Sequence, residues 1–72
     1  MDLAPRVRAN AVAPGAILAA EWEEEGFSAA IRRTPLGRGG TPEEVAHAVR
    51  YLLEATFVTG QVIAVDGGWS IR

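Results

Sequence analysis

Few side chains in this chain could carry acid–base or nucleophilic chemistry. The 72 residues include one histidine, one tyrosine and no cysteine. All seven basic residues are arginines, so the chain offers no lysine. Four of the nine acids gather in one run, Glu21 and Glu23 to Glu25, and such a run on a short helix is typical of a solvated face. We therefore expect neither a metal site nor a catalytic residue within these 72 residues.

Three further side chains have both a chemical and a structural interpretation. Trp22 either stacks on a flat heterocycle or packs in a core or an interface. His47 falls on the charged side of a predicted helix and is interpreted as a surface histidine. Arg38 precedes that helix and could hold an anion at its N-terminus. Glu43 and Glu44 already occupy the first turn and repel phosphate, so we expect Arg38 to pair with a carboxylate such as Asp66.

The first half of the chain predicts one strand and two short helical segments. Residues 6–13 have the pattern of a strand of small residues, which the Pro14-Gly15 pair ends. Residues 17–25 have a helical pattern that Gly26 is expected to stop. Residues 27–33 are expected to form a second short helix before Pro35.

The clearest element is a helix from Pro42 to Ala55. Thr41 and Glu44 are spaced as a capping box, and Pro42 stands at the first helical position. Glu43, His47, Arg50 and Glu54 recur on one side at helical spacing. The apolar positions form a stripe on the other side, and they are Val45, Val49, Leu52 and Leu53.

Residues 61–65 form a short, nearly unbroken apolar run, closed by Asp66-Gly67-Gly68. A strand that is apolar on both faces is typical of a parallel sheet covered by helices on both sides. Seventy-two residues are too few to build such a sheet, and a chain of this length is marginal on its own. We therefore expect the end of a larger α/β protein, in which two strands joined by helices make a right-handed parallel crossover.

Three blocks, in order and correctly spaced, resemble the C-terminal third of the short-chain dehydrogenase/reductase family. RVRANAVAPG resembles the family's sixth strand and the turn after it. TPLGRGGTPEEVAHAVRYLL resembles the loop and helix that follow, and FVTGQVIAVDGGWS resembles the seventh strand. The resemblance implies the C-terminal β-α-β portion of a Rossmann-type doubly wound parallel sheet. Residues 1–72 would then be the C-terminal fragment of a single domain whose first five strands are missing.

The resemblance also implies a function for the whole protein: an NAD(P)H-dependent oxidoreductase that reduces a small carbonyl or imine substrate. PGAIL, an acidic segment and TPLGR look most like bacterial pteridine reductases. The cofactor would be NADP or NAD, and Pro14, Gly15 and Ile17 would bind it, with the nicotinamide close to the turn because Gly15 has no side chain. In many members a threonine that contacts the cofactor stands where this chain has Ala19.

The family's catalytic Tyr-x-x-x-Lys pair is missing, because the residue four positions after Tyr51 is Ala55. The fragment alone is therefore expected to be inactive, and the alternative is a non-catalytic interaction module that associates with full-length relatives. The resemblance implies a homo-oligomer formed through the Pro42–Ala55 helix and the last strand with Trp69.

Composition narrows the partners further. A formal net charge of −2 argues against nucleic acid as a main partner. No apolar run approaches the roughly 20 residues of a membrane span. A cytoplasmic location is expected, and the lack of cysteine fits it although it does not define the compartment.

Overall fold

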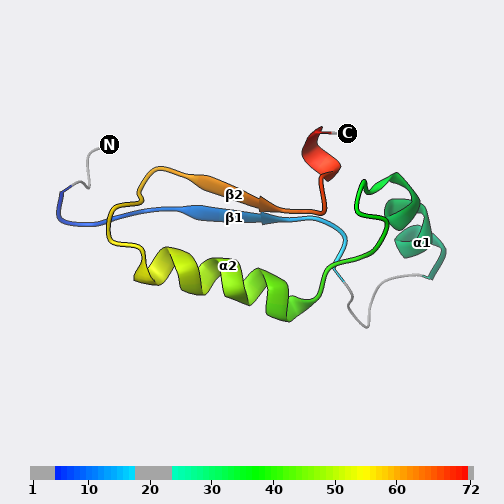
Figure 1. Ribbon diagram of the computed structural model, residues 1–72, viewed down its shortest axis with the longest axis horizontal. Coiled ribbons are helices and arrows are strands. Elements are labelled where there is room, and N and C mark those ends of the chain that lie inside the picture. The colour runs from blue at the N-terminus through cyan, green and yellow to red at the C-terminus, as the bar shows by residue number, and fades with distance from the viewer. Residues whose placement is uncertain (1–4, 18–23, 72) are drawn as a thin grey trace.

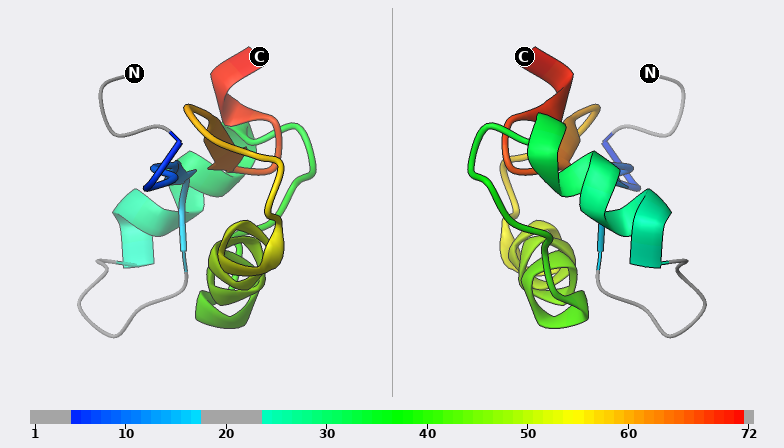
Figure 2. Two further views of the ribbon diagram at one scale, coloured as in Figure 1. Left: turned by 90° about the vertical axis from the view of Figure 1, so that its left-hand side faces the viewer. Right: turned by 90° about the vertical axis from the view of Figure 1, so that its right-hand side faces the viewer.

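The computed structural model describes residues 5–17 and 24–71. Their order is β1 (Ala11–Pro14), α1 (Glu24–Arg33), α2 (Pro42–Glu54), β2 (Val62–Val65) and a final 3-10 helix, η1 (Trp69–Ile71). The strands lie side by side, α2 runs along one side of them, and α1 lies beyond their ends (Figures 1 and 2). The chain is thus an α/β unit extended along its strands, with principal extents of 45 × 25 × 17 Å.

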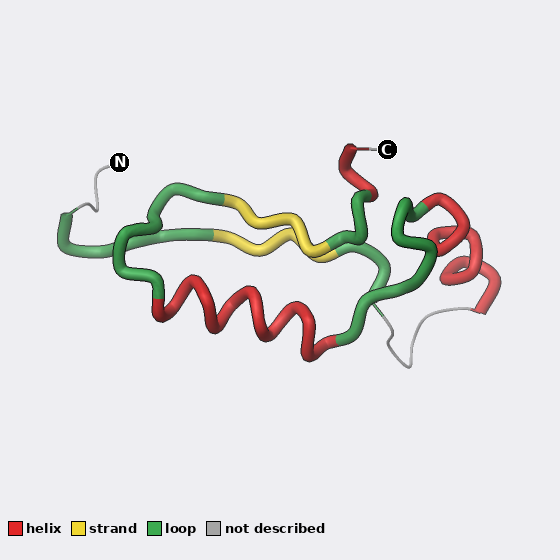
Figure 3. Tube along the Cα trace, viewed as in Figure 1, coloured by secondary structure: helices red, strands yellow, loops and turns green. Residues whose placement is uncertain are grey.

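The two strands pair in parallel, as the order of elements predicts. Ala11 is in register with Val62, Val12 with Ile63, Ala13 with Ala64, and Pro14 with Val65. Both strands are shorter than predicted, since β1 begins at Ala11 instead of Arg6 and β2 begins at Val62 instead of Gln61. Extended loop segments precede both strands (Figure 3).

Side chains explain why β1 begins so late. Before Ala11, the chain is joined to the turn at residues 58–61 mainly through Asn10 and Thr59 rather than through a regular ladder. The Asn10 amide donates to the Val58 carbonyl at 3.0 Å and its oxygen accepts from the Gln61 N–H at 3.0 Å. The Thr59 hydroxyl accepts from the Ala9 N–H at 3.1 Å. Together with the backbone bond from the Gly60 N–H to the Ala9 carbonyl at 2.8 Å, these bonds align the two segments ahead of the regular ladder.

The strand faces differ in exposure. Val12 and Pro14 line a groove against α2, so this side of β1 faces the helix. Because residues in register share a face, Ile63 and Val65 belong to the same side, and both are half-buried. The other face carries Ala13 and Val62, which are exposed, Val62 to 69%.

Helix α2 confirms the predicted start and nearly the predicted end. Thr41 is the N-cap, the reciprocal capping box with Glu44 is complete, and Pro42 stands at the first helical position. Ala55 is the C-cap residue rather than the last helical one. Leu52 is buried and Val45 half-buried, but Leu53 is 72% exposed. All four residues of the predicted stripe line the groove between α2 and β1, so the stripe faces the strands as predicted, and the two strands leave Val49 and Leu53 partly uncovered.

Helix α1 corrects the prediction that Gly26 ends a helical segment. One helix runs from Glu24 to Arg33 and passes through Gly26. A glycine inside a helix costs only about 1 kcal/mol relative to alanine, which the rest of a helix can absorb. Several predictions fall on residues outside the described part of the chain, namely Ala19, Glu21, Trp22 and Glu23. The same holds for the side chains of Glu24 and Glu25.

Among the residues that the structure describes, we find no helix with both the length and the apolar character needed to cross a membrane.

Candidate functional site

The turn that follows β1 is fixed on two sides. The Gly15 N–H donates to the Val65 carbonyl at 3.0 Å, so pairing with β2 continues past the end of the strand. The Ala16 carbonyl accepts from the Gly40 N–H at 2.8 Å, and Ile17 forms a parallel bridge with Gly40. The structure thus brings Pro14, Gly15 and Ile17 together at the carboxyl end of β1, where ligands bind in open α/β sheets.

Asp66 fills the space beside Gly15 that a side chain would need. A Cβ atom on Gly15 would lie 2.8 Å from both the Cα and the Cβ of Asp66. Glycine is required here because the ends of β1 and β2 approach too closely for a side chain. The missing side chain of Gly15 therefore makes room for Asp66, and not for a nicotinamide ring as expected.

Two more glycines pack the loop before α2 against its neighbours. A Cβ atom on Gly40 would lie 2.8 Å from Cδ1 of Ile17, and one on Gly39 would overlap the ring of Phe27 in α1. The loop therefore runs in contact with both the Pro14–Ile17 turn and the start of α1. These contacts hold Ile17 at the N-terminal end of α2.

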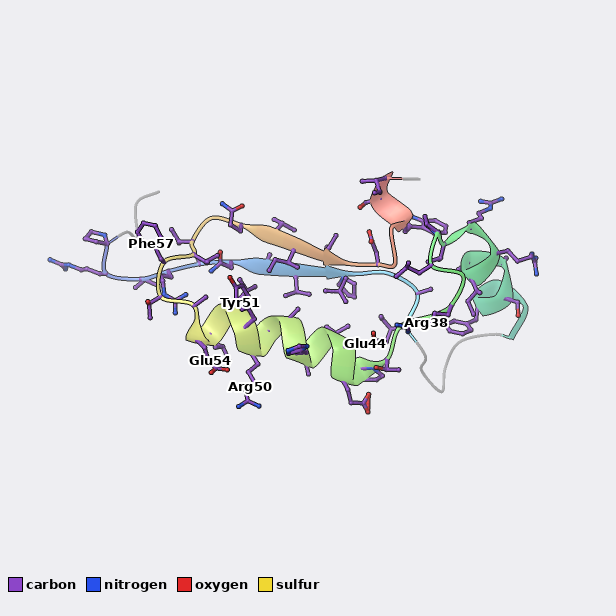
Figure 4. All side chains as sticks on the ribbon, in the orientation of Figure 1. Arg38, Glu44, Arg50, Tyr51, Glu54 and Phe57 are labelled. Atoms are coloured by element: carbon purple, nitrogen blue, oxygen red, sulfur yellow. The ribbon has the colours of Figure 1, made fainter. Side chains whose placement is uncertain are left out.

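Arg38 and Glu44 form a two-pronged ion pair beside the start of α2 (Figure 4). Nη1 of Arg38 donates to Oε1 of Glu44 at 3.0 Å, and Nη2 donates to Oε2 at 2.9 Å. The Thr41 N–H donates to Oε1 at 3.1 Å. The Arg38 hydrogen bond, followed by that from Thr41, lowers the pKa of Glu44 to about 2. Arg38 pairs with a carboxylate as predicted, but the partner is Glu44 in the first turn of α2, six residues further along the chain, rather than Asp66.

Asp66 instead organises the turn after β2. Its carboxylate accepts from the Gly68 N–H at 2.9 Å and from the Ser70 N–H at 3.0 Å. Hydrogen bonding from Ser70 and then from the Gly68 backbone lowers the pKa of Asp66, so the group is ionised near neutral pH. The part of the chain that the structure describes contains no group of three or more acids and histidines that could hold a metal.

Two hollows flank the turn. A cavity of about 480 Å³ lies at the strand ends, lined by Ala16, Thr34, Leu36, Asp66, Gly67 and Gly68 among others. A groove of about 570 Å³ lies between β1 and α2, and Pro14 lines it with Val12 and Val49. Gly15 and Ile17 line neither hollow. The sequence did not predict that Thr34 and the turn after β2 line the cavity at the strand ends. The available signals were Thr34-Pro35 directly after a helix and the Gly67-Gly68 pair directly after a strand.

A parallel β-α-β unit of this kind defines the class of protein: it is part of a Rossmann-type α/β fold, in which the connection between two parallel strands contains helices. A family model described as enoyl-(acyl carrier protein) reductase matches residues 1–70. The chain belongs to the short-chain dehydrogenase/reductase family.

Three relatives show the extent of the likeness. Carbonyl reductase family member 4 of Danio rerio is 51% identical over 65 residues, which are 86% of this chain and 26% of the relative. FolM alternative dihydrofolate reductase 1 from Brucella canis, complexed with NADP, superposes with a TM-score of 0.86 at 40% identity and is matched by 99% of this chain. A short-chain dehydrogenase/reductase from Brucella melitensis gives a TM-score of 0.85 at 37% identity over 99% of this chain.

The match covers only part of each relative. The chain spans 26% of the fish carbonyl reductase, 29% of FolM and 31% of the Brucella melitensis protein. It thus corresponds to between a quarter and a third of their length.

Proposed function

We propose that these 72 residues are the C-terminal portion of an NAD(P)H-dependent oxidoreductase, here called the parent reductase, which reduces a small carbonyl or imine substrate. In this proposal the chain alone supplies no catalytic group. It supplies the turn beside the nicotinamide, formed by Pro14, Gly15 and Ile17, and part of a substrate lid within residues 16–33. A cytoplasmic location remains a prediction from composition.

One observation carries the proposal most directly. The chain superposes over 99% of its length on a protein whose structure was solved in complex with NADP. In this chain the Pro14–Ile17 turn stands at the carboxyl end of a parallel strand, is held by backbone bonds from both sides, and lies near the N-terminal end of α2. That position is the usual one for a dinucleotide in an open α/β sheet.

The substrate class rests on the same relatives. The relative from Danio rerio is a carbonyl reductase, and the solved relative from Brucella canis is an alternative dihydrofolate reductase. These names favour reduction of a C=O or C=N bond, and the second favours a pteridine as the particular substrate. The roughly 480 Å³ cavity beside Ala16, with its mixed apolar and polar lining, would suit one end of such a small molecule.

We also propose that the parent reductase is a homo-oligomer that uses α2 and β2. Exposed apolar side chains support this surface: Leu53 is 72% exposed, Val62 69% and Ile71 87%. Trp69 is half-buried within the chain, so it offers less apolar area to a partner than its size implies. The alternative role, an interaction module that associates with full-length relatives, would use the same surface.

The test of function is a binding and turnover experiment on the parent reductase. NADPH and NADH are titrated first, and a dihydropteridine, a 3-oxoacyl thioester and a simple ketone are then offered with the tighter cofactor. Saturable binding of one cofactor and oxidation of it with at least one substrate are expected. Absence of cofactor binding would refute the proposal, whereas ketone reduction without pteridine reduction would remove only the pteridine assignment.

A further inference from the structure

The C-terminal end of α1 rests on the turn formed by Asp66, Gly67 and Gly68. The Leu36 N–H donates to the Gly67 carbonyl at 3.0 Å. Thr34 is only 6% exposed, and its hydroxyl donates to the Ala30 carbonyl at 2.8 Å, which closes the last turn of α1. The end of α1 is therefore tied to the turn through residues 34–36.

The fit between these two segments leaves no room for a side chain on either glycine. A Cβ atom on Gly67 would lie 2.6 Å from Cγ2 of Thr34, and one on Gly68 would lie 2.9 Å from Cγ of Pro35. Both glycines also have positive φ angles, 63° and 96°. The Asp66 carboxylate fixes the turn by accepting from Gly68 and Ser70. The turn is thus a rigid and closely fitted support.

The same turn contacts the proposed cofactor turn on its other side. Cα and Cβ of Asp66 both lie 2.8 Å from the position that a Cβ atom on Gly15 would take, and the Val65 carbonyl just before Asp66 accepts from the Gly15 N–H. One three-residue turn therefore touches the Pro14–Ile17 turn and the end of α1 at once. Its geometry sets the distance between them.

We propose that Asp66–Gly68 is a seat that positions α1 relative to the Pro14–Ile17 turn, with Gly67 and Gly68 as positioning residues for substrate binding. This inference rests on the proposed function, in which α1 belongs to the substrate lid and the Pro14–Ile17 turn faces the nicotinamide. Both glycines line the roughly 480 Å³ cavity proposed for the substrate, but the positions of their missing Cβ atoms face Thr34 and Pro35. They act through Thr34 and Pro35, and a change at the seat should move the lid while the cofactor turn stays in place.

The test compares Gly67→Ala with Gly37→Ala in the parent reductase. Gly37 is a matched control, because its φ of 74° resembles that of Gly67 while no atom lies within 4 Å of its missing Cβ. Both variants carry the same backbone strain, and only Gly67→Ala collides with Thr34. Amide exchange over residues 24–33 measures the seating of α1, independently of any activity.

Gly67→Ala is expected to speed amide exchange in α1 and to raise KM by about tenfold, which corresponds to about 1.4 kcal/mol and lies in the range for overpacking. Because the lost contacts hold the lid in the ground state and the transition state alike, kcat should change little. The cofactor Kd should stay within about twofold, since the Pro14–Ile17 turn keeps its own bonds. Gly37→Ala should leave KM and α1 exchange as in the wild type.

A rescue variant isolates the contact. Thr34→Ser removes the methyl group that Gly67→Ala strikes and keeps the hydroxyl that bonds to Ala30. The double variant Thr34→Ser/Gly67→Ala should therefore recover most of the slow exchange and low KM. If Gly67→Ala does not fold, Pro35→Ala, which removes the ring atoms over Gly68 without adding volume, should change exchange and KM in the same direction.

Three results would each refute the proposal that Asp66–Gly68 is a seat for α1. They are unchanged amide exchange of α1 in Gly67→Ala, an equal change in Gly37→Ala, and exchange in the double variant that is as fast as in Gly67→Ala. Faster exchange with an unchanged KM would overturn its role in substrate binding. A parent reductase that binds neither NADPH nor NADH would instead refute the proposed function, and the exchange comparison would still decide whether the seat exists.

Discussion

Replacing Arg8 by methionine in the parent reductase should release the C-terminal end of α2 from the strands. Nη1 of Arg8 donates to the carbonyls of Leu52 at 3.0 Å, Ala55 at 2.7 Å and Val58 at 3.3 Å, and Nη2 donates to that of Leu53 at 3.2 Å. Helix α2 has no basic residue in its own last turn. Arg8 therefore supplies both the missing donors and the positive charge that favours a helix C-terminus.

The magnitude follows from the exposure of the site. Hydrogen bonds from a charged donor contribute about 1.5–3 kcal/mol when shielded, and the helix dipole adds about 0.3–1 kcal/mol. Because Arg8 is largely exposed, water replaces part of what is lost, and we expect a loss of about 2 kcal/mol in the free energy of unfolding. Arg8→Lys keeps the charge without the planar fork and should lose about half as much.

Chemical denaturation of the parent reductase measures the loss, and amide exchange over residues 50–58 locates it. Arg6→Met is the matched control, because Arg6 is also exposed and makes no hydrogen bond or ion pair with the described residues. A stability loss for Arg8→Met no larger than that for Arg6→Met would refute the C-capping role. So would exchange that rises throughout the protein without a local maximum at the end of α2.

Three further outcomes are expected. The pKa of Glu44 is about 2, against 4.5 for the free group, so its carboxylate stabilises the fold fully above pH 4.5 and loses that effect as the pH falls toward 2. Glu44→Gln should therefore flatten the curve of stability against pH in this range. A curve for the variant that runs parallel to that of the wild type would contradict this. The 72-residue chain alone should show no NADPH-dependent reduction and should self-associate or exchange amides rapidly; a well-protected active monomer would exclude this. Trp69→Ala should weaken the oligomer of the parent reductase by roughly 2 kcal/mol or more if it is a hot spot; unchanged sedimentation at high dilution would remove Trp69 from the interface.

Local signals predict the elements of this chain well. The Thr41–Glu44 capping box, Pro42 at the first helical position and the apolar run before Asp66 each encode their structure within a few residues, and the structure has α2 and β2 where they indicate. The start of β1 could not be located in this way. It depends on Asn10 and Thr59, which are far apart in the sequence and meet only in the fold. Gly26 was a local signal that predicted a helix end, but α1 continues through it because the other contacts of the helix offset the local cost of a glycine.

The site shows the same division between local and distant signals. The Pro14-Gly15 pair marks the turn, but the reason for glycine lies in Asp66, 51 residues further on. The sequence alone does not distinguish Asp66 from Glu44 as the partner of Arg38. The folded structure shows that Glu44 accepts hydrogen bonds from both terminal nitrogens of Arg38. The role of Arg8 had no sequence signal at all, since an arginine in an extended segment does not reveal which helix end it will meet.

The central claim is that the Pro14–Ile17 turn lies at the cofactor of an NAD(P)H-dependent reductase. Amide exchange of the parent reductase with and without saturating NADPH tests it most directly. We expect slower exchange at residues 15–17 on binding, with residues 56–60 at the opposite end of the strands unchanged. NADPH binding that leaves residues 15–17 as exposed to exchange as before, or that protects residues 56–60 instead, would contradict the assignment.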